Sequence, residues 1–370
     1  MVEQKVLVAD NDYVELDNYI QENGFKTVFL VCDDSLRFLR IKEYFDKVEK
    51  RLNIRLVYFS DFTPNPLYES VVKGVKLFND ESCDAIFAVG GGSAMDVAKC
   101  IKLYSNMDHS VNYLNQDIVP NDIPLLAVPT TAGTGSEATR YAVIYYEGEK
   151  QSVADYSCIP STVMMDATVL KTLPEYQKKS TMLDALCHAI ESYWSVNSTD
   201  ESKVYSKEAI QLIMANKDSY LANQDEGNAN MLKAANVAGK AINITQTTAG
   251  HAMCYKLTSL YGIAHGHAAA LCLSKLWPYM VDNTDKCIDT RGKDYVQEIF
   301  RDIANAFGCN DAKDAVALFD DLLKELGFNN PKADEKDYEI LSSSVNLVRL
   351  KNNPIGLDYE SINSLYRQIV

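Results

Sequence analysis

The chain has 370 residues, of which 47% are hydrophobic and 24% charged, a composition typical of a globular protein large enough for two domains. Its 36 basic and 51 acidic residues give a formal net charge of −15, which argues against nucleic acid or an anionic membrane as a partner. No apolar run reaches the roughly 18 residues that span a bilayer, and the acidic N-terminus MVEQKVLVADND argues against a signal peptide. The nine cysteines include no C-x-x-C pair, so we expect reduced thiols in a cytoplasmic protein.

Four short apolar runs in the first half of the chain alternate with segments of helical spacing. The runs are KTVFLVCDD (26–34), RLVYFSDF (55–62), DAIFAVGGG (84–92) and IPLLAVPTT (123–131). Near-continuous apolar strands of this kind are typical of a parallel sheet that helices cover on both faces. The sequence therefore predicts a doubly wound α/β domain over residues 1–170.

The pattern changes near Leu173 and Pro174, after which alanine, leucine and charged residues recur at helical spacing. Segments such as NMLKAANVAGKAINIT and DAVALFDDLLKELG contain no strand-like run. We therefore expect an all-helical second domain over residues 171–370. Within it, the polar segment 222–230 predicts an exposed loop.

The sequence GGGS at residues 90–93 lies between a predicted strand and a predicted helix. Glycines let backbone N–H groups approach an anion, and the N-terminus of the following helix adds a partial positive charge. In an open α/β sheet, the pyrophosphate of a dinucleotide binds at such a turn. The alternative is a tight turn without a ligand, although three consecutive glycines exceed what a turn requires.

A second glycine loop, PTTAGTGSEATR (129–140), follows the last of these runs. It contains G-x-G-x-x-A, a weak signal on its own, and several hydroxyl groups suited to phosphate or nicotinamide contacts. These hydroxyls belong to Thr130, Thr131, Thr134 and Ser136. An ordinary hydroxyl-rich loop is the alternative. The chain has no G-x-x-x-x-G-K-[ST] sequence, which argues against a P-loop NTPase.

Asp33 and Asp34 end the first apolar run. A carboxylate at the end of a strand can accept hydrogen bonds from an adenosine ribose and repel a 2′-phosphate, which favours NAD over NADP. The alternative role is an acid at the start of a helix, where it complements the helix dipole.

Four of the five histidines lie between residues 188 and 267. Asp184 and His188 are four residues apart on a predicted helix and so share one face, as paired metal ligands often do. His251 and His265 would lie about 21 Å apart on one straight helix, too far to share a metal. A helix break at Gly262 would bring them together. A buried structural histidine is the alternative at each position.

Four stretches, in the same order along the chain, resemble the iron-containing, group III alcohol dehydrogenase family. They are AVGGGSAMDVAK (88–99), VPTTAGTGSEATRYAVI (128–144), DALCHAIESYWS (184–195) and the segment from His251 to IAHGH. The resemblance implies an N-terminal dinucleotide-binding domain, a helical C-terminal domain and an active site in the cleft between them. It also implies NAD(H), with NADP(H) as the alternative, and Fe²⁺, with Zn²⁺ as the alternative.

The resemblance also implies roles for single residues, by their positions in the motifs. The implied metal ligands are Asp184, His188, His251 and His265. The implied pyrophosphate loop consists of Gly91, Gly92, Ser93 and Asp96. The other implied cofactor contacts are Thr130, Thr131 and Thr134 along the cofactor, Asp33 near the adenosine ribose and Lys150 near the nicotinamide ribose.

One position departs from the family pattern. Many members carry a histidine, linked to proton transfer, four residues after the third ligand, where this chain has Tyr255. Either Tyr255 replaces it as the proton donor, or solvent and the ribose hydroxyls deliver the proton.

The string HAMCYKLTSLYGIAHGH (251–267) looks most similar to the branch of the family that reduces phosphonoacetaldehyde to 2-hydroxyethylphosphonate. An anionic substrate would require a cationic clamp, for which Arg140 and Lys256 are the candidates. The alternative places Arg140 in an interdomain salt bridge and Lys256 in solvent.

These features together predict a metal-dependent, NAD(P)H-linked alcohol dehydrogenase or aldehyde reductase that acts on a small aldehyde or alcohol as a homodimer. A general short-chain alcohol dehydrogenase is the first alternative. A glycerol-dehydrogenase-like enzyme, a dehydroquinate-synthase-like enzyme and a nucleotide-binding regulator without chemistry are the others.

Overall fold

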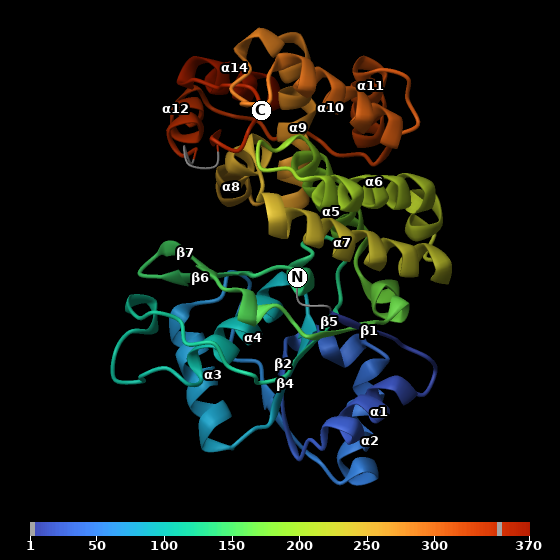
Figure 1. Ribbon diagram of the computed structural model, residues 1–370, viewed down its shortest axis with the longest axis vertical. Helices are drawn as coiled ribbons and strands as arrows, with labels where there is room; N and C mark the ends of the chain where they lie inside the picture. The colour runs from blue at the N-terminus through green and yellow to red at the C-terminus, as the bar shows by residue number, and fades with distance from the viewer. Residues whose placement is uncertain (1–3, 346–349) are drawn as a thin grey trace. The chain divides into compact units, whose positions relative to one another are not determined.

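The structure is a computed structural model that describes residues 4–345 and 350–370 (Figure 1). The chain forms two compact units. The first consists of Met1–Leu173 and Asn223–Leu232, and the second consists of Pro174–Ala222 and Lys233–Val370.

The first unit is built on a six-stranded sheet in the order β1-β8-β5-β4-β2-β3, in which every neighbouring pair is parallel. Its strands are β1 (Lys5–Val8), β2 (Thr27–Cys32), β3 (Arg55–Phe59), β4 (Ala85–Gly90), β5 (Leu125–Pro129) and β8 (Thr162–Met165). The helices between them are α1 (Val14–Asn23), α2 (Ile41–Leu52), α3 (Tyr68–Asp80) and α4 (Gly92–Tyr104).

Helices cover both faces of this sheet. Successive side chains of a strand point to opposite faces, so neighbouring strands distribute their aromatic residues between two cores. On one face, Phe29 of β2 packs edge-on against Phe78 of α3, with ring centroids 5.6 Å apart. On the other face, Phe87 of β4 packs against Tyr19 of α1, with centroids 6.2 Å apart. The doubly wound α/β domain predicted from the apolar runs is confirmed.

A two-stranded antiparallel hairpin, β6 (Tyr141–Tyr146) and β7 (Glu149–Ala154), lies outside the main sheet and was not expected from the sequence. Tyr146 pairs with Glu149, so the connection has two residues, Glu147 and Gly148. Both have positive φ, 51° and 80°, as a two-residue hairpin turn of type I′ requires. The sequence signal that could have revealed the hairpin is the pair Glu147-Gly148, with glycine as the second turn residue, after the β-branched and aromatic run YAVIYY.

Among the residues of the second unit that the structure describes, the regular elements are all helices, as predicted. They are α5 (Glu175–Trp194), α6 (Asp200–Leu221), α7 (Asp225–Thr245), α8 (Ala249–Tyr261), α9 (His265–Asp282), α10 (Lys293–Ala306), α11 (Ala312–Glu325), α12 (Glu335–Ser343) and α14 (Tyr359–Ile369). Trp277 of α9 forms part of its core, with its ring centroid 6.0 Å from Trp194 of α5 and 6.1 Å from Phe319 of α11.

The loop expected at residues 222–230 is wrong, because α7 begins at Asp225. Asp225 and Glu226 occupy the first turn, where carboxylates complement the helix dipole. The polar composition of this segment therefore marks the start of a helix. α7 begins in the part of the chain that belongs to the first unit and continues into the second.

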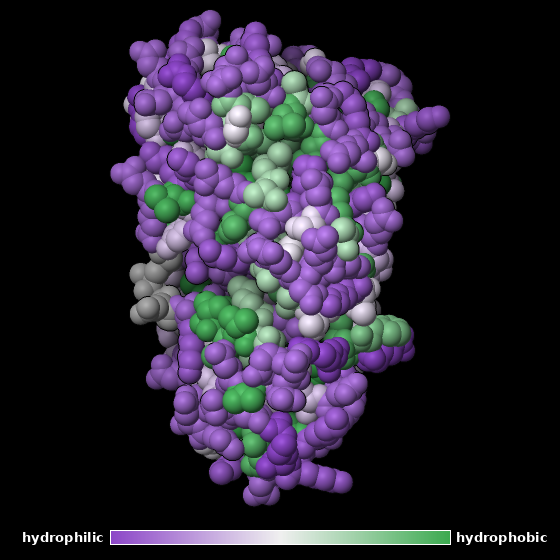
Figure 2. All heavy atoms as spheres, turned by 90° about the vertical axis from the view of Figure 1, so that its right-hand side faces the viewer, coloured by the Kyte–Doolittle hydropathy of each residue, from purple (hydrophilic) through white to green (hydrophobic). Residues whose placement is uncertain are grey.

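Figure 2 shows one face of the molecule, on which hydrophilic side chains predominate and apolar ones gather in small separate patches. Among residues 4–345 and 350–370, no helix combines the length and the apolar character needed to cross a membrane. All nine cysteines lie in these ranges and are reduced thiols.

Candidate metal centre and cofactor loops

Helix α5 presents three acid or imidazole side chains on one face. Asp184 and His188 are one helical turn apart, and Glu191 follows three residues later. Asp184 is 3% exposed, His188 6% and Glu191 0%. Buried polar groups are costly unless they are paired, so this face is the candidate site.

The break that the sequence predicted at Gly262 is present in the structure. Helix α8 ends at Tyr261, and Gly262 caps it in the left-handed conformation with φ 68°. Helix α9 then begins at His265. The turn brings the His265 ring back to the His251 ring, with centroids 5.3 Å apart.

A close helix contact at Gly266 holds His265 beside α5. A Cβ atom on Gly266 would lie 1.9 Å from the carbonyl oxygen of Ser180 and 2.8 Å from Cβ of Asp184. Only glycine allows the start of α9 to approach the α5 backbone this closely. Close packing of α9 against α5 therefore explains why position 266 is a glycine.

The structure brings all four predicted metal ligands together around one carboxylate oxygen. Oδ1 of Asp184 lies 3.4 Å from Nε2 of His251, 3.9 Å from Nε2 of His265 and 4.0 Å from Nε2 of His188. The ligand atoms of Asp184, His188 and His251 all lie within 4.8 Å of one another. The side chain of His265 differs from the other three in being 36% exposed.

The electrostatics of this cluster favour a bound cation. Burial opposes ionisation of Asp184, but His188, His251 and His265 hold its pKa well below the usual range. Burial lowers the pKa of His251, but Glu191 and Asp184 outweigh it and raise this pKa to about 9. With neutral imidazoles, the two buried carboxylates carry two negative charges, which a divalent ion would balance. Three imidazoles and one carboxylate suit Fe²⁺ or Zn²⁺.

Glu191 is a residue that the sequence reasoning missed. Its Oε2 atom accepts a hydrogen bond from Nδ1 of His251, on the side of the ring opposite the cluster. Its Oε1 atom accepts from the hydroxyl of Thr248 at 2.5 Å and from the backbone N–H of Thr248 at 3.2 Å. The signal was its position on α5, seven residues after Asp184 and hence on the same helical face.

Tyr255 and Cys254 contact His265, the more exposed of the predicted ligands. The Tyr255 ring stacks on the His265 ring, with centroids 5.4 Å apart and an interplanar angle of 27°. Sγ of Cys254 lies 3.6 Å from Nδ1 of His265 and donates to the carbonyl of His251. Lys256, the next residue of α8, is partly exposed.

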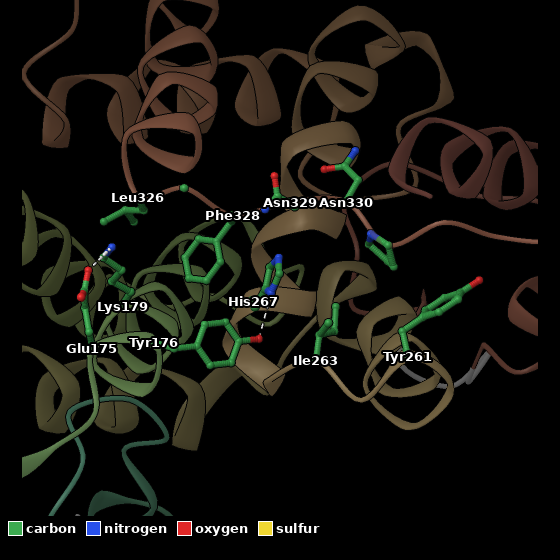
Figure 3. Close-up of a pocket in the computed structure, with 12 residues that line it drawn as sticks. Glu175, Tyr176, Lys179, Tyr261, Ile263, His267, Leu326, Phe328, Asn329 and Asn330 are labelled. Atoms are coloured by element: carbon green, nitrogen blue, oxygen red, sulfur yellow. Dashed lines mark hydrogen bonds and ion pairs between the residues drawn. The ribbon is translucent and has the colours of Figure 1, made fainter.

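His267 faces a different environment from His265. It is 5% exposed, and its Nδ1 atom lies 3.0 Å from the hydroxyl of Tyr176. Figure 3 shows this contact on the wall of a cavity of about 750 Å³, beside Phe328 and Lys179. Burial lowers the pKa of His267.

In the first unit, the two glycine loops lie against each other. A Cβ on Gly91 would be 3.5 Å from Cγ2 of Thr131, and a Cβ on Gly92 would be 3.2 Å from Cγ2 of Thr134. The backbone N–H of Thr130 donates to the carbonyl of Gly90 at 3.0 Å. Two loops separated by about forty residues therefore form one surface at the carboxyl ends of β4 and β5, where open α/β sheets bind ligands.

The first glycine loop leads into α4, whose first residues are Gly92 and Ser93. The first backbone N–H groups of a helix have no partner within it and attract anions. Asp33 lies at the same edge, with Oδ2 3.7 Å from the position of a Cβ on Gly90. Its Oδ1 atom accepts from the backbone N–H of Ser35 at 2.8 Å, so Asp33 also caps a short 3-10 helix.

The structure places Asp96 against the second glycine loop. Its Oδ1 atom accepts from the hydroxyl of Ser136 at 3.1 Å. Burial raises the pKa of Asp96 to about 6, against opposing contributions from Lys99 and, more weakly, Lys150 of β7. Lys99 is fully buried, and its Nζ atom donates to the carbonyls of Ser136, Thr139 and Tyr141. Asp96 and Lys99 thus tie the second loop to α4.

Three cationic side chains follow Asp33 within nine residues of the chain, and the 2′-phosphate of NADP would require such a charge. A cavity of about 830 Å³ in the first unit is lined in part by Arg37, Arg40 and Lys42. Lys42 already pairs with Asp46, which reduces its availability to a phosphate.

Arg140 packs against tyrosines of the same unit. Its guanidinium lies 4.8 Å from the ring centroid of Tyr141 and 4.7 Å from that of Tyr156. Nη1 also donates to the Tyr156 hydroxyl at 2.7 Å. These contacts fix the orientation of the guanidinium.

Known proteins share the pattern over almost the whole chain. The profile "Iron-containing alcohol dehydrogenase" matches residues 3–167, and "Fe-containing alcohol dehydrogenase family, C-terminal" matches residues 178–370. A crystal structure of 1,3-propanediol oxidoreductase has a TM-score of 0.88 at 26% identity, with 100% of each chain covered.

Three curated relatives have comparable identity. Phosphonoacetaldehyde reductase of Streptomyces viridochromogenes is 31% identical over 298 residues, which are 76% of this chain and 75% of that enzyme. 1,3-propanediol dehydrogenase of Citrobacter freundii is 32% identical over 276 residues, 72% of this chain and 71% of that enzyme. Aldehyde-alcohol dehydrogenase 2 of Entamoeba histolytica is 31% identical over 271 residues, which are 69% of this chain but only 31% of that longer enzyme. The chain belongs to the iron-containing alcohol dehydrogenase family, whose enzymes use iron and NAD(H).

Proposed function

We propose that this protein reduces small aldehydes to alcohols with NADH, using a divalent iron held by Asp184, His188, His251 and His265. The observation that carries the proposal is the convergence of three imidazoles on one buried carboxylate oxygen, at 3.4 to 4.0 Å. Three helices, α5, α8 and α9, and a glycine-dependent turn are needed to build that cluster, which a merely structural set of histidines would not require.

The reaction takes an aldehyde, NADH and a proton to an alcohol and NAD⁺. The bound iron supplies Lewis-acid polarisation of the substrate oxygen, and the nicotinamide supplies the hydride. The four ligands fix the position of the ion, and the buried carboxylates compensate its charge. Burial of the cluster strengthens these electrostatic interactions, because the local dielectric constant is low.

For the cofactor, we propose that backbone N–H groups of Gly91, Gly92 and Ser93 bind the pyrophosphate. Thr130, Thr131 and Thr134 line the cofactor on the adjoining loop, and Lys150 contacts the nicotinamide ribose. Asp96 acts by holding the second loop through Ser136.

Asp33 contacts the adenosine ribose in this proposal and favours NADH over NADPH. Arg37 and Arg40, which follow Asp33 by four and seven residues in the chain, keep NADPH as the alternative cofactor. Asp33→Asn should narrow the difference between the dissociation constants of the two cofactors, because the amide no longer repels a 2′-phosphate. An unchanged difference would exclude this role.

Tyr255 is our candidate for the proton donor, and its ring stack on His265 allows a clean test. Tyr255→Phe preserves the stacked ring and removes only the hydroxyl. If the hydroxyl delivers the proton, kcat should fall by about 10² to 10⁴-fold with unchanged metal content. An unchanged kcat would assign proton delivery to solvent or the ribose hydroxyls.

For the substrate, we propose phosphonoacetaldehyde, which the enzyme would reduce to 2-hydroxyethylphosphonate. The relative from Streptomyces viridochromogenes supports this choice, and Arg140 and Lys256 are the candidate cations for binding the phosphonate. The second candidate is a neutral short-chain aldehyde. The relative from Citrobacter freundii supports this alternative, together with the contact of Arg140 to Tyr156.

Steady-state kinetics of the Fe²⁺-loaded enzyme separate the two candidates. We expect kcat/KM to be far higher for phosphonoacetaldehyde than for propanal, with the ratio falling as salt rises. Arg140→Ala or Lys256→Ala should reduce that ratio and spare propanal reduction. Equal kcat/KM values for the charged and the neutral aldehyde would leave a general alcohol dehydrogenase.

We also propose that the protein works in the cytoplasm as a homodimer. Nine reduced cysteines suit a reducing compartment. The edge strand β1 exposes Val6 and Val8, which is a surface that a second copy could cover. Light scattering coupled to size-exclusion chromatography tests the dimer, and a monomeric mass would exclude it.

A further inference from the structure

The buried carboxylate of Glu191 receives only hydrogen-bond donors. Its Oε1 atom lies 3.2 Å from the backbone N–H of Thr248 and 3.3 Å from the backbone N–H of His251. Backbone N–H groups cannot act as acceptors. The atom at the position of Oε1 must therefore be a hydrogen-bond acceptor.

The direction of the third bond to Oε1 is also fixed. Nε1 of Trp194 donates to the hydroxyl oxygen of Thr248 at 2.9 Å, and an indole nitrogen is a donor only. The Thr248 hydroxyl must then give its own proton to Oε1 of Glu191, 2.5 Å away. Trp194 thus orients Thr248, and Thr248 orients Glu191.

The remaining oxygen of Glu191 controls the ring of His251. Three donors meet Oε1, which favours the ionised carboxylate, so Oε2 accepts and its partner Nδ1 of His251 donates. A neutral imidazole with its proton on Nδ1 has a lone pair on Nε2. That atom is the one that faces Oδ1 of Asp184, 3.4 Å away.

The packing around Glu191 gives independent support. A Cβ atom on Gly250 would lie 2.9 Å from Oε1 of Glu191 and 2.2 Å from Cδ1 of Leu273. Position 250 has no positive φ, so its glycine is required for space and not for backbone conformation. The residue before His251 thus leaves room for the carboxylate.

We propose that Glu191 is a positioning residue that holds His251 in the Nδ1–H tautomer, with the Nε2 lone pair directed at the metal. This inference rests on the proposed metal-dependent function and goes beyond its four ligands. Carboxylate–histidine–metal arrangements of this kind set ring orientation and ligand basicity.

Glu191→Gln tests the proposal, because the amide has one acceptor instead of two. The two backbone N–H groups and the Thr248 hydroxyl will take its oxygen, which leaves the NH₂ group facing Nδ1 of His251. An NH₂ group donates, so the His251 proton must move to Nε2, where it blocks metal binding. We expect the Zn²⁺ and Co²⁺ dissociation constants to rise roughly 10- to 100-fold.

The measurement is competition with a chromogenic chelator on the purified full chain, together with the visible spectrum of the Co²⁺ form. Thr248→Val should weaken metal binding less than Glu191→Gln, and Thr248→Ser should restore it. Asp289→Asn is the matched control, since Asp289 is another buried carboxylate of the second unit, paired with Arg291. It should lower the thermal midpoint and leave both the metal affinity and the Co²⁺ spectrum unchanged.

The outcomes separate this inference from the proposed function. A parent protein that binds no metal contradicts the proposed function and the inference with it. A parent that binds metal, with a Glu191→Gln variant of equal affinity and identical Co²⁺ spectrum, overturns the inference alone. If Glu191→Gln does not fold, the metal affinities of Thr248→Val and Thr248→Ser test the inference instead. Equal metal affinities of these two variants overturn the inference.

Discussion

His265 and His267 are two residues apart and have different surroundings. Nε2 of His265 lies 3.9 Å from Asp184, whereas Nδ1 of His267 contacts the hydroxyl of Tyr176. His265→Ala should therefore lower metal content and turnover sharply, and NADH affinity should survive because the glycine loops are unchanged. His267→Ala is the matched control and should retain the metal. Metal analysis by mass spectrometry checks both, and full metal content in His265→Ala would remove it from the ligand set.

Substitutions at Gly91 and Gly90 should have different effects: the first should weaken cofactor binding and the second should lower stability. A Cβ on Gly91 has only ordinary contacts with Thr131, at 3.5 and 3.6 Å, whereas a Cβ on Gly90 would lie 2.6 Å from Cβ of Ala94. We expect Gly91→Ala to fold normally and to bind NADH more weakly, because its methyl group obstructs the approach of the pyrophosphate to backbone N–H groups. Gly90→Ala should instead be destabilised by about 1–3 kcal/mol.

Fluorescence titration with NADH and thermal unfolding check these two glycine variants. Unchanged NADH affinity in Gly91→Ala would mean that the pyrophosphate binds elsewhere.

Asp96 should make the stability of the first unit depend on pH. Burial raises its pKa to about 6 in the folded state, whereas an unfolded aspartate titrates near pH 4. Between these values the folded state holds a proton that the unfolded chain has lost, so the contribution of Asp96 to the free energy of unfolding falls as the pH rises. Asp96→Asn cannot ionise. Its thermal midpoint relative to the parent should therefore increase from about pH 4 to about pH 7, and a constant difference would contradict the raised pKa.

At the scale of elements, the contact of α9 with α5 builds the metal centre. Gly266→Ala would place Cβ 1.9 Å from the carbonyl oxygen of Ser180, so the start of α9 must move. That movement carries His265 away from Asp184. We expect destabilisation of about 1–3 kcal/mol and weaker metal binding.

Gly262→Ala is the control for this helix contact. A Cβ atom at position 262 would have no neighbour within 4 Å, so no steric clash is expected. The positive φ predicts only backbone strain for the alanine. It should lower the thermal midpoint and keep the metal. Equal metal affinity in Gly266→Ala and the parent would show that this contact does not position His265.

The elements that the sequence revealed were those with one clear periodicity. The buried runs around Phe29 and Phe87 predicted strands, and the spacing of Asp184 and His188 predicted a shared helical face. The hairpin of β6 and β7 was missed because YAVIYY in β6 does not alternate between apolar and polar residues, although Glu147 and Gly148 form a standard turn.

The missed parts of the site depend on contacts between distant segments. Glu191 lies on the expected face of α5, yet its role follows only from Thr248 and His251, which are 57 and 60 residues away along the chain. The stack of Tyr255 on His265 likewise depends on the angle of the turn at Gly262. Sequence spacing along one helix carries no information of this kind.

At the scale of the whole molecule, the proposed function requires both units, because the first carries the glycine loops and the second carries the proposed metal ligands. The net charge of −15 would attract divalent cations and repel an anionic substrate. The attraction of divalent cations agrees with the proposed metal centre. A phosphonate substrate would need local cations to overcome the repulsion by the net negative charge.

Anaerobic titration of the metal-free enzyme with Fe²⁺, followed by NADH oxidation in the presence of an aldehyde, tests the central claim most directly. The account predicts no turnover in the metal-free enzyme and turnover that rises until one Fe²⁺ per chain is bound. It also predicts that His188→Ala shows neither binding nor turnover at the same iron concentration. Full aldehyde reduction by the metal-free parent, or by His188→Ala, would contradict it.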